Sequence, residues 1–85
     1  MEQQVKLSIE DRVKNIICNK LAVKPEKVTP EADLRTDLGA DSLDLMELSS
    51  SLEEEFGIRI PEADEKTIQT YGDAVRYVRA YYSRQ

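Results

Sequence analysis

The sequence of 85 residues contains no histidine, no tryptophan and one cysteine, Cys18. Without histidine, the usual base that activates a serine nucleophile is missing, and a zinc site is disfavoured as well. A single cysteine excludes an internal disulfide framework and fits a reducing compartment, so we expect a cytoplasmic protein. The chain is also too short to form a deep catalytic cleft. Together these absences predict that the protein is not an enzyme.

Basic residues are scarce in the middle of the chain. Residues 31–65 contain twelve acidic and two basic residues, a net charge of −10, whereas the whole chain carries −5. Such a segment repels nucleic acid and anionic membranes, and no apolar run is long enough to span a membrane. We therefore expect the protein to bind neither nucleic acid nor a membrane. Basic protein surfaces would be attracted, although acidic helix faces also serve simply to solvate a protein.

The apolar residues recur at helical spacing and not at strand spacing. They predict main helices over residues 9–21, from about 42 to 56, and 71–82, with a short helix over 62–66 after Pro61. We expect an all-α fold: a small four-helix bundle with three main helices and one short helix. The chain is expected to be one domain over residues 1–85, with its core at about 8–82, and to be a monomer.

Residues of the N-cap type precede each main helix. Ser8 stands before the first helix. Asp41 with Asp44, and Thr70 with Asp73, have the three-residue spacing of a capping box, in which each side chain bonds the other's backbone N–H group. These pairs predict where the second and last helices begin.

A long loop connects the first two main helices. Residues 22–40 contain two of the three prolines and Gly39, and they show no helical period. Thr29 and Pro30 are predicted to start a single turn. Loops of this length in a small domain need a reason, and we expect that Val28, Leu34 and Leu38 attach this one to the core.

Ser42 is predicted to be the first residue of the second helix, at the surface where the long loop ends. It lacks a neighbouring base, so a nucleophilic role is disfavoured. A helix N-terminus has unpaired N–H groups and a partial positive charge, so a phosphate attached to a side chain there would be stabilised. Two interpretations follow: Ser42 receives a phosphate-linked group from another enzyme, or it only begins a helix.

Four segments at fixed spacing resemble the acyl carrier protein family. They are GADSLD at residues 39–44, LEEEFGIRIP at 52–61, SIEDRVKNII at 8–17 and AVKPEKVT at 22–29. The resemblance covers residues 8–82 without insertion or deletion. It implies that Ser42 carries 4′-phosphopantetheine, which a phosphopantetheinyl transferase takes from coenzyme A. The arm would hold acyl groups as thioesters and deliver them to enzymes of fatty-acid or related lipid biosynthesis.

The resemblance also implies two sets of residues around Ser42. One set would meet basic surfaces on acyl-chain synthesising and acyl-transfer enzymes: Asp41, Leu43, Asp44, Met46, Glu47, Glu53 and Glu54. The other set packs between the helices in the family and would part to shelter an acyl chain: Val13, Leu34, Leu52, Ile60, Ile68 and Ala74.

Two departures from the family pattern keep alternatives open. Ser49, Ser50 and Ser51 stand where fatty-acid carriers usually have two larger apolar residues and a small one, and Arg59 stands where the family often has an acid. Ser50 in particular cannot supply the apolar partner contact that is often found at its position. The chain could therefore be a specialised carrier of polyketide, aminoacyl or peptidyl units. It could also be an acidic protein-interaction module without a prosthetic group.

Overall fold

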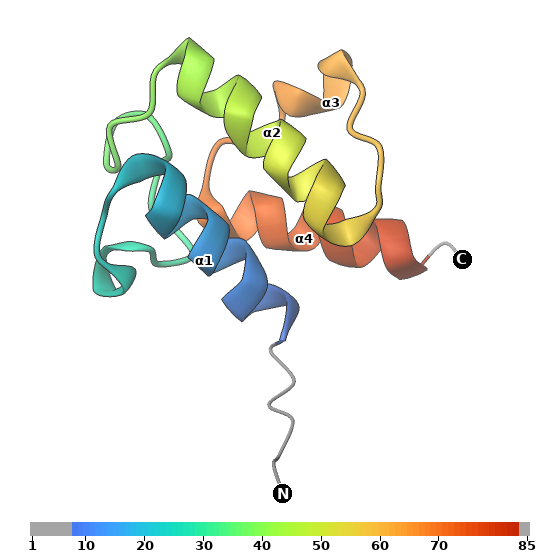
Figure 1. Cartoon of the computed structure of the whole chain (residues 1–85), viewed down its shortest axis with the longest axis horizontal. Coiled ribbons are helices and arrows are strands. Elements are labelled where there is room, and N and C mark those ends of the chain that lie inside the picture. The colour runs from blue at the N-terminus through green and yellow to red at the C-terminus, as the bar shows by residue number, and fades with distance from the viewer. Residues whose placement is uncertain (1–7, 84–85) are drawn as a thin grey trace, which may run out of the picture.

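A computed structural model describes residues 8–83, in which all regular structure is helical (Figure 1). The elements are α1 (Ile9–Leu21), the 3₁₀ helix η1 (Pro25–Lys27), α2 (Ser42–Phe56), α3 (Glu62–Glu65) and α4 (Tyr71–Ser83). The predicted all-α bundle with three long helices and one short helix is confirmed. Only η1 was not predicted; it begins at Pro25, whose fixed backbone suits a first helical position.

The predicted caps begin the helices as expected. The Ser8 hydroxyl accepts a hydrogen bond from the backbone N–H of Asp11 at 3.2 Å. Before α4, the Thr70 hydroxyl accepts from Asp73 N at 3.0 Å, and an Asp73 carboxylate oxygen accepts from Thr70 N at 3.1 Å. At the C-terminal end of α2, Gly57 adopts the left-handed conformation with φ of 65° that commonly terminates a helix.

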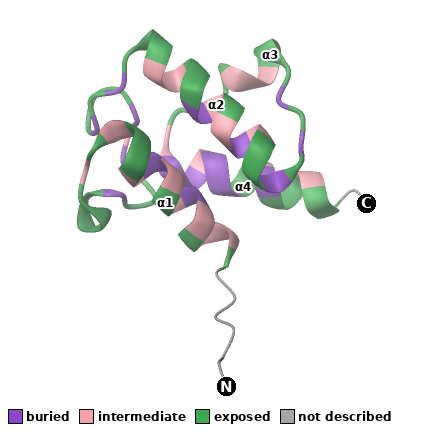
Figure 2. Ribbon diagram, in the orientation of Figure 1, coloured by how far each residue is buried: buried purple, intermediate pink, exposed green. Residues whose placement is uncertain are grey.

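The core lies around α1, which packs against both α2 and α4, whereas α2 and α4 approach each other less closely. In Figure 1, α1 and α2 run side by side, and α4 crosses behind the C-terminal end of α2. Val13 and Val78 are completely buried, and Ile17 is almost so. Figure 2 shows the buried residues on the inner sides of these helices and the exposed residues along the outer side of α2. Among the described residues, no helix is long and apolar enough to cross a membrane.

The long loop is attached to the bundle by both side chains and backbone. Val28, Leu34 and Leu38 are all buried, as predicted. The backbone N–H of Leu34 also donates to the Gln69 carbonyl at 2.9 Å, and Tyr71 N donates to the Ala32 carbonyl at 3.2 Å. The loop therefore reaches across to the start of α4 and is fixed against it.

The turn predicted at Thr29 and Pro30 is also present. Ala32 N donates to the Thr29 carbonyl at 2.9 Å, which closes a single turn. Gly72 N then donates to the Pro30 carbonyl at 3.0 Å, so this turn packs directly on the first residues of α4.

Candidate functional site

Ser42 is exposed and is the first residue of α2. Asp41 is the N-cap, and one of its carboxylate oxygens accepts from Asp44 N at 2.9 Å. In return, an Asp44 carboxylate oxygen accepts from Asp41 N at 3.1 Å. The reciprocal pair fixes the first turn of α2 on both sides of Ser42. The serine hydroxyl is thus presented to solvent at a rigid helix start.

The backbone that leads into Ser42 is held by the long loop. Ala40 is buried, and its N–H donates to the Leu34 carbonyl at 2.8 Å. Gly39 has φ of 79°, a conformation that side-chain-bearing residues rarely adopt, and its N–H donates to the Arg35 carbonyl at 3.0 Å. The glycine therefore permits the sharp turn that brings residues 34–35 beside the start of α2.

A cavity of about 530 Å³ opens beside Ser42. Its walls come from α2, from the loop at residues 33–36, from the segment at residues 65–69, and from one residue each of α1 and α4. The apolar lining residues are Ile17, Leu34, Leu45, Met46, Leu48, Leu52, Ile68 and Ala74. The polar ones are Asp33, Arg35, Thr36, Ser42, Ser49, Glu65, Lys66 and Gln69. One cavity thus connects the exposed serine with the apolar interior between α2 and α4.

The structure brings together four of the six residues expected to shelter an acyl chain. Leu34, Leu52, Ile68 and Ala74 line the cavity. Val13 and Ile60 do not. Val13 is completely buried within the packed core, and Ile60 is buried on the segment that follows α2.

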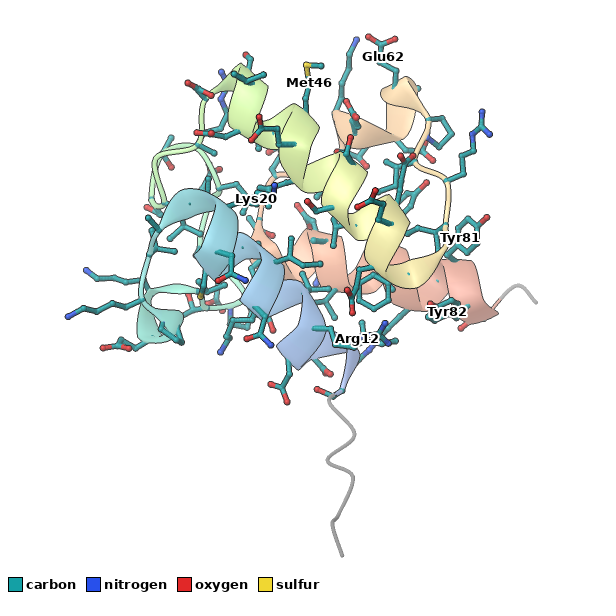
Figure 3. All side chains as sticks on the ribbon, viewed as in Figure 1. Arg12, Lys20, Met46, Glu62, Tyr81 and Tyr82 are labelled. Atoms are coloured by element: carbon teal, nitrogen blue, oxygen red, sulfur yellow. The ribbon has the colours of Figure 1, made fainter. Side chains whose placement is uncertain are left out.

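The residues expected to face partner proteins lie mostly on the outer side of α2. Leu43 and Met46 are 61% and 59% exposed, unusually high fractions for large apolar side chains. Glu47 and Glu54 are exposed as well. In Figure 3 the Met46 side chain projects away from the body of the bundle. Exposed apolar and acidic side chains therefore stand together on α2 near Ser42.

Glu53 differs from the exposed Glu47, Glu54 and Glu55 of α2 because it is half-buried. One of its carboxylate oxygens accepts from Ile60 N at 2.7 Å, and its backbone carbonyl accepts from Ile58 N at 3.2 Å. The residue thus holds the segment after α2 against the helix. Its spacing on the helical wheel gave no signal of this role, because Ile60 lies seven residues away along the chain.

Sequence reasoning missed several polar residues of the cavity. Arg35, Thr36, Lys66 and Gln69 lie on irregular segments, where no periodic pattern predicts which way a side chain points. Ser49 departs from the family pattern, and it lines the cavity together with Ser42 and Met46.

Asp33, another of the polar lining residues, has a fixed carboxylate. It accepts hydrogen bonds from Thr36 N at 3.0 Å and Arg35 N at 2.9 Å. These two backbone bonds, with a smaller contribution from the Arg35 charge, lower the pKa of Asp33. The carboxylate is therefore ionised at neutral pH and stabilises the turn of the loop.

Comparison with known proteins decides the family. A family model described as a phosphopantetheine attachment site matches residues 11–78, which include Ser42 and all the residues that line the cavity. Among solved structures, the chain is similar to the acyl carrier protein from Enterococcus faecalis, with 36% sequence identity and a TM-score of 0.76. That match covers 86% of this chain and 92% of the other. The chain belongs to the acyl carrier protein family.

Members of this family are carriers and not enzymes, and their covalent prosthetic group is 4′-phosphopantetheine. The described residues fit such a group. Ser42 offers an exposed hydroxyl at a helix N-terminus, where N–H groups lack partners within the helix. The cavity beside it has both polar and apolar walls, as an arm with amide groups and an apolar cargo requires.

Proposed function

We propose that Ser42 is the residue to which 4′-phosphopantetheine is attached. The observation that carries this proposal is the position of its exposed hydroxyl, at the start of α2 and on the rim of the cavity. Thr36 and Ser49 also line that cavity, but Thr36 lies on the loop and Ser49 lies inside α2, away from the unpaired N–H groups of a helix N-terminus.

The prosthetic group supplies a thiol that holds acyl groups as thioesters, while the chain contributes position and shelter. The Asp41 and Asp44 cap keeps Ser42 at a fixed helix start, and the N-terminal dipole of α2 favours a phosphate there. Leu34, Leu52 and neighbouring apolar residues would shield a cargo chain from water. Val13 and Ile60, which are buried outside the cavity lining, would join this shelter only if the helices moved apart.

The partners are proposed to be a phosphopantetheinyl transferase and the basic surfaces of acyl-chain synthesising and acyl-transfer enzymes. Leu43 and Met46 supply exposed apolar area, and the acidic residues around them supply charge. Charges at the rim of an interface mainly raise the association rate, so partners would bind quickly and leave quickly. The binding residues proposed for this surface are Asp41, Leu43, Asp44, Met46, Glu47, Glu53 and Glu54.

We assign the carrier to fatty-acid or related lipid biosynthesis, as a cytoplasmic monomer. The aspartate before Ser42 and the acidic segment support acyl cargo. The three serines at residues 49–51 favour the alternative, a specialised carrier of polyketide, aminoacyl or peptidyl units, because Ser49 adds a hydroxyl to the cavity wall.

The intact mass of the protein purified from its own source tests these proposals, with Ser42→Ala and Ser49→Ala measured alongside. We expect one phosphopantetheine on the wild type and on Ser49→Ala, and none on Ser42→Ala. Additional mass on the thiol identifies the cargo and separates lipid biosynthesis from the specialised pathways. A wild type that stays bare after treatment with coenzyme A and a broad-specificity transferase would instead support an acidic interaction module.

A further inference from the structure

Two basic side chains share the cavity with Ser42. Arg35 reaches it from the loop before α2, and Lys66 reaches it from the segment after α3. Both residues are exposed. The ion pairs of residues 8–83 join Arg12 to Glu55, Arg76 to Asp73 and Arg79 to Glu10, so neither cavity cation belongs to one. Neither forms an ion pair among residues 8–83, although Arg35 belongs to the acidic segment of residues 31–65 and Lys66 directly follows it.

Backbone hydrogen bonds hold Arg35 beside the residues that immediately precede Ser42. The Arg35 carbonyl accepts from Gly39 N at 3.0 Å, and the adjacent Leu34 carbonyl accepts from Ala40 N at 2.8 Å. Arg35 N is itself held by an Asp33 carboxylate oxygen at 2.9 Å. Its backbone is therefore fixed beside the residues that lead directly into α2. Its guanidinium forms no ion pair among residues 8–83, although its charge helps to lower the pKa of Asp33.

Lys66 approaches from a different part of the chain. It is the C-cap of α3, and its backbone N–H donates to the Asp64 carbonyl. Since it lines the cavity that also contains Ser42 and Arg35, two cations from separate segments border one space. Two carboxylates, those of Glu65 and Asp33, border it too. The Asp33 carboxylate is held by backbone N–H groups of the loop but keeps its charge.

The charge balance at Ser42 makes such cations useful. A phosphodiester on this serine adds a negative charge to a segment whose net charge is already −10, and Asp41 and Asp44 flank the attachment position. Like charges this close repel one another, and the dipole of α2 offsets only part of that repulsion. Guanidinium and ammonium groups are the side chains that bind phosphate oxygens best.

We propose that Arg35 and Lys66 form a two-cation site that binds the phosphodiester joining the prosthetic arm to Ser42. The proposal rests on the proposed attachment at Ser42. The two cations hold the first bonds of the arm against the mouth of the cavity, and they thereby direct the rest of the arm along the cavity side of α2.

The test compares the apo protein with the holo protein made from it by a transferase and coenzyme A, with complete conversion verified by mass. The holo protein carries no cargo, so its changes report the arm alone. The variants are Arg35→Gln, Lys66→Gln, their double combination and Arg59→Gln. Arg59→Gln is the matched control, because Arg59 is the other basic residue of the acidic segment and does not line the cavity.

Two readouts are used. In wild type, we expect conversion to shift the NMR resonance of the Arg35 side-chain Nε–H group. The second readout is the difference in Tm between the holo and the apo form. At low salt, we expect this difference to be ~3 °C larger in wild type than in the double variant. In ~0.5 M NaCl, the wild-type difference should fall to nearly the value of the double variant, because salt screens the charges. The Arg59→Gln control should behave as wild type.

An unmoved Arg35 resonance, or an equal Tm difference in wild type and double variant, would overturn the two-cation site while leaving attachment at Ser42 intact. Failure of wild type to accept the group at all would overturn the proposed function itself. The conservative Arg35→Lys variant, which keeps the charge, should retain most of the Tm difference. If its Tm difference were as small as that of Arg35→Gln, a role that depends on charge would be contradicted.

Discussion

Asp41 and Asp44 each accept a hydrogen bond from the other's backbone N–H group, at 2.9 Å and 3.1 Å, and Ser42 lies between them. The same two carboxylates are proposed to meet basic partner surfaces. One pair of side chains thus sets the start of α2 and contributes to the acidic surface around the serine, so substitutions must separate the two effects.

Asp44→Ala should destabilise the protein by about 1 kcal/mol, because it leaves Asp41 N without its capping partner. Urea denaturation measures this loss, and hydrogen exchange of the amides at the start of α2 should become faster. Glu47→Gln is the control, since it removes a charge from the same surface without touching the cap. Equal stability losses in the two variants would show that charge, and not capping, is responsible.

Tyr71→Phe should cost about 1 kcal/mol at neutral pH. Tyr71 is buried, and its hydroxyl donates to the Glu10 carbonyl at 2.8 Å, which ties α4 to the first turn of α1. Thermal unfolding measures the loss. Tyr81→Phe serves as the matched control on the same helix, and it should have a smaller effect because Tyr81 is only half-buried.

Stability should also fall at alkaline pH through Tyr71. Burial, with the nearby Glu10 and Asp11 carboxylates, raises the pKa of Tyr71 in the folded protein. A raised folded pKa contributes stability that is fully present below the unfolded value of about 10 and is lost as pH rises through the folded one. The difference in stability between wild type and Tyr71→Phe should therefore shrink above about pH 10. A constant difference across that range would contradict this account.

The two glycines at the ends of α2 and α4 should respond differently to alanine. Gly57→Ala should cost about 1 kcal/mol, because its φ of 65° disfavours any side chain even though the space around it is open. Gly72→Ala should cost more, about 2–3 kcal/mol, since the new Cβ would lie 2.8 Å from the Pro30 carbonyl oxygen. Urea denaturation of both variants gives the comparison. If Gly72→Ala lost no more stability than Gly57→Ala, the turn at Pro30 would have to move away from the new Cβ at little cost.

Arg12→Lys should destabilise by ~0.5–1 kcal/mol although the charge is kept. The Arg12 guanidinium donates to the Glu55 carboxylate at 2.9 Å and to the Glu55 carbonyl at 3.0 Å, and it stacks 4.4 Å from the centroid of the Phe56 ring. An ammonium group cannot make all three contacts. Arg59→Lys, at an exposed position without an ion pair among the described residues, is the control for thermal unfolding. Identical Tm changes in the two variants would refute a special role for the guanidinium.

Near neighbours along the chain determined most of the fold. The caps at Ser8, Asp41 and Thr70 act over three residues, and the apolar stripes repeat every three or four, so both could be read from the sequence. The residues themselves also placed Ser42 at the exposed start of α2, where the structure has it. The resemblance to the family added the expectation that it carries a prosthetic group.

Tertiary structure alone decided the composition of the cavity. Helical periodicity predicts which residues face the interior, but not which of them line a cavity. Val13 and Ile60 are as buried as Leu34 and Leu52, yet only the latter two line the cavity.

The physical reason is that α1 packs against both α2 and α4 while α2 and α4 stay further apart, which leaves space between them. Arg35, Ser49 and Lys66 reach that space from three separate segments of the chain. Because residues 32–34 pair with the start of α4, their placement depends on contacts more than thirty residues away, where no local pattern carries the information.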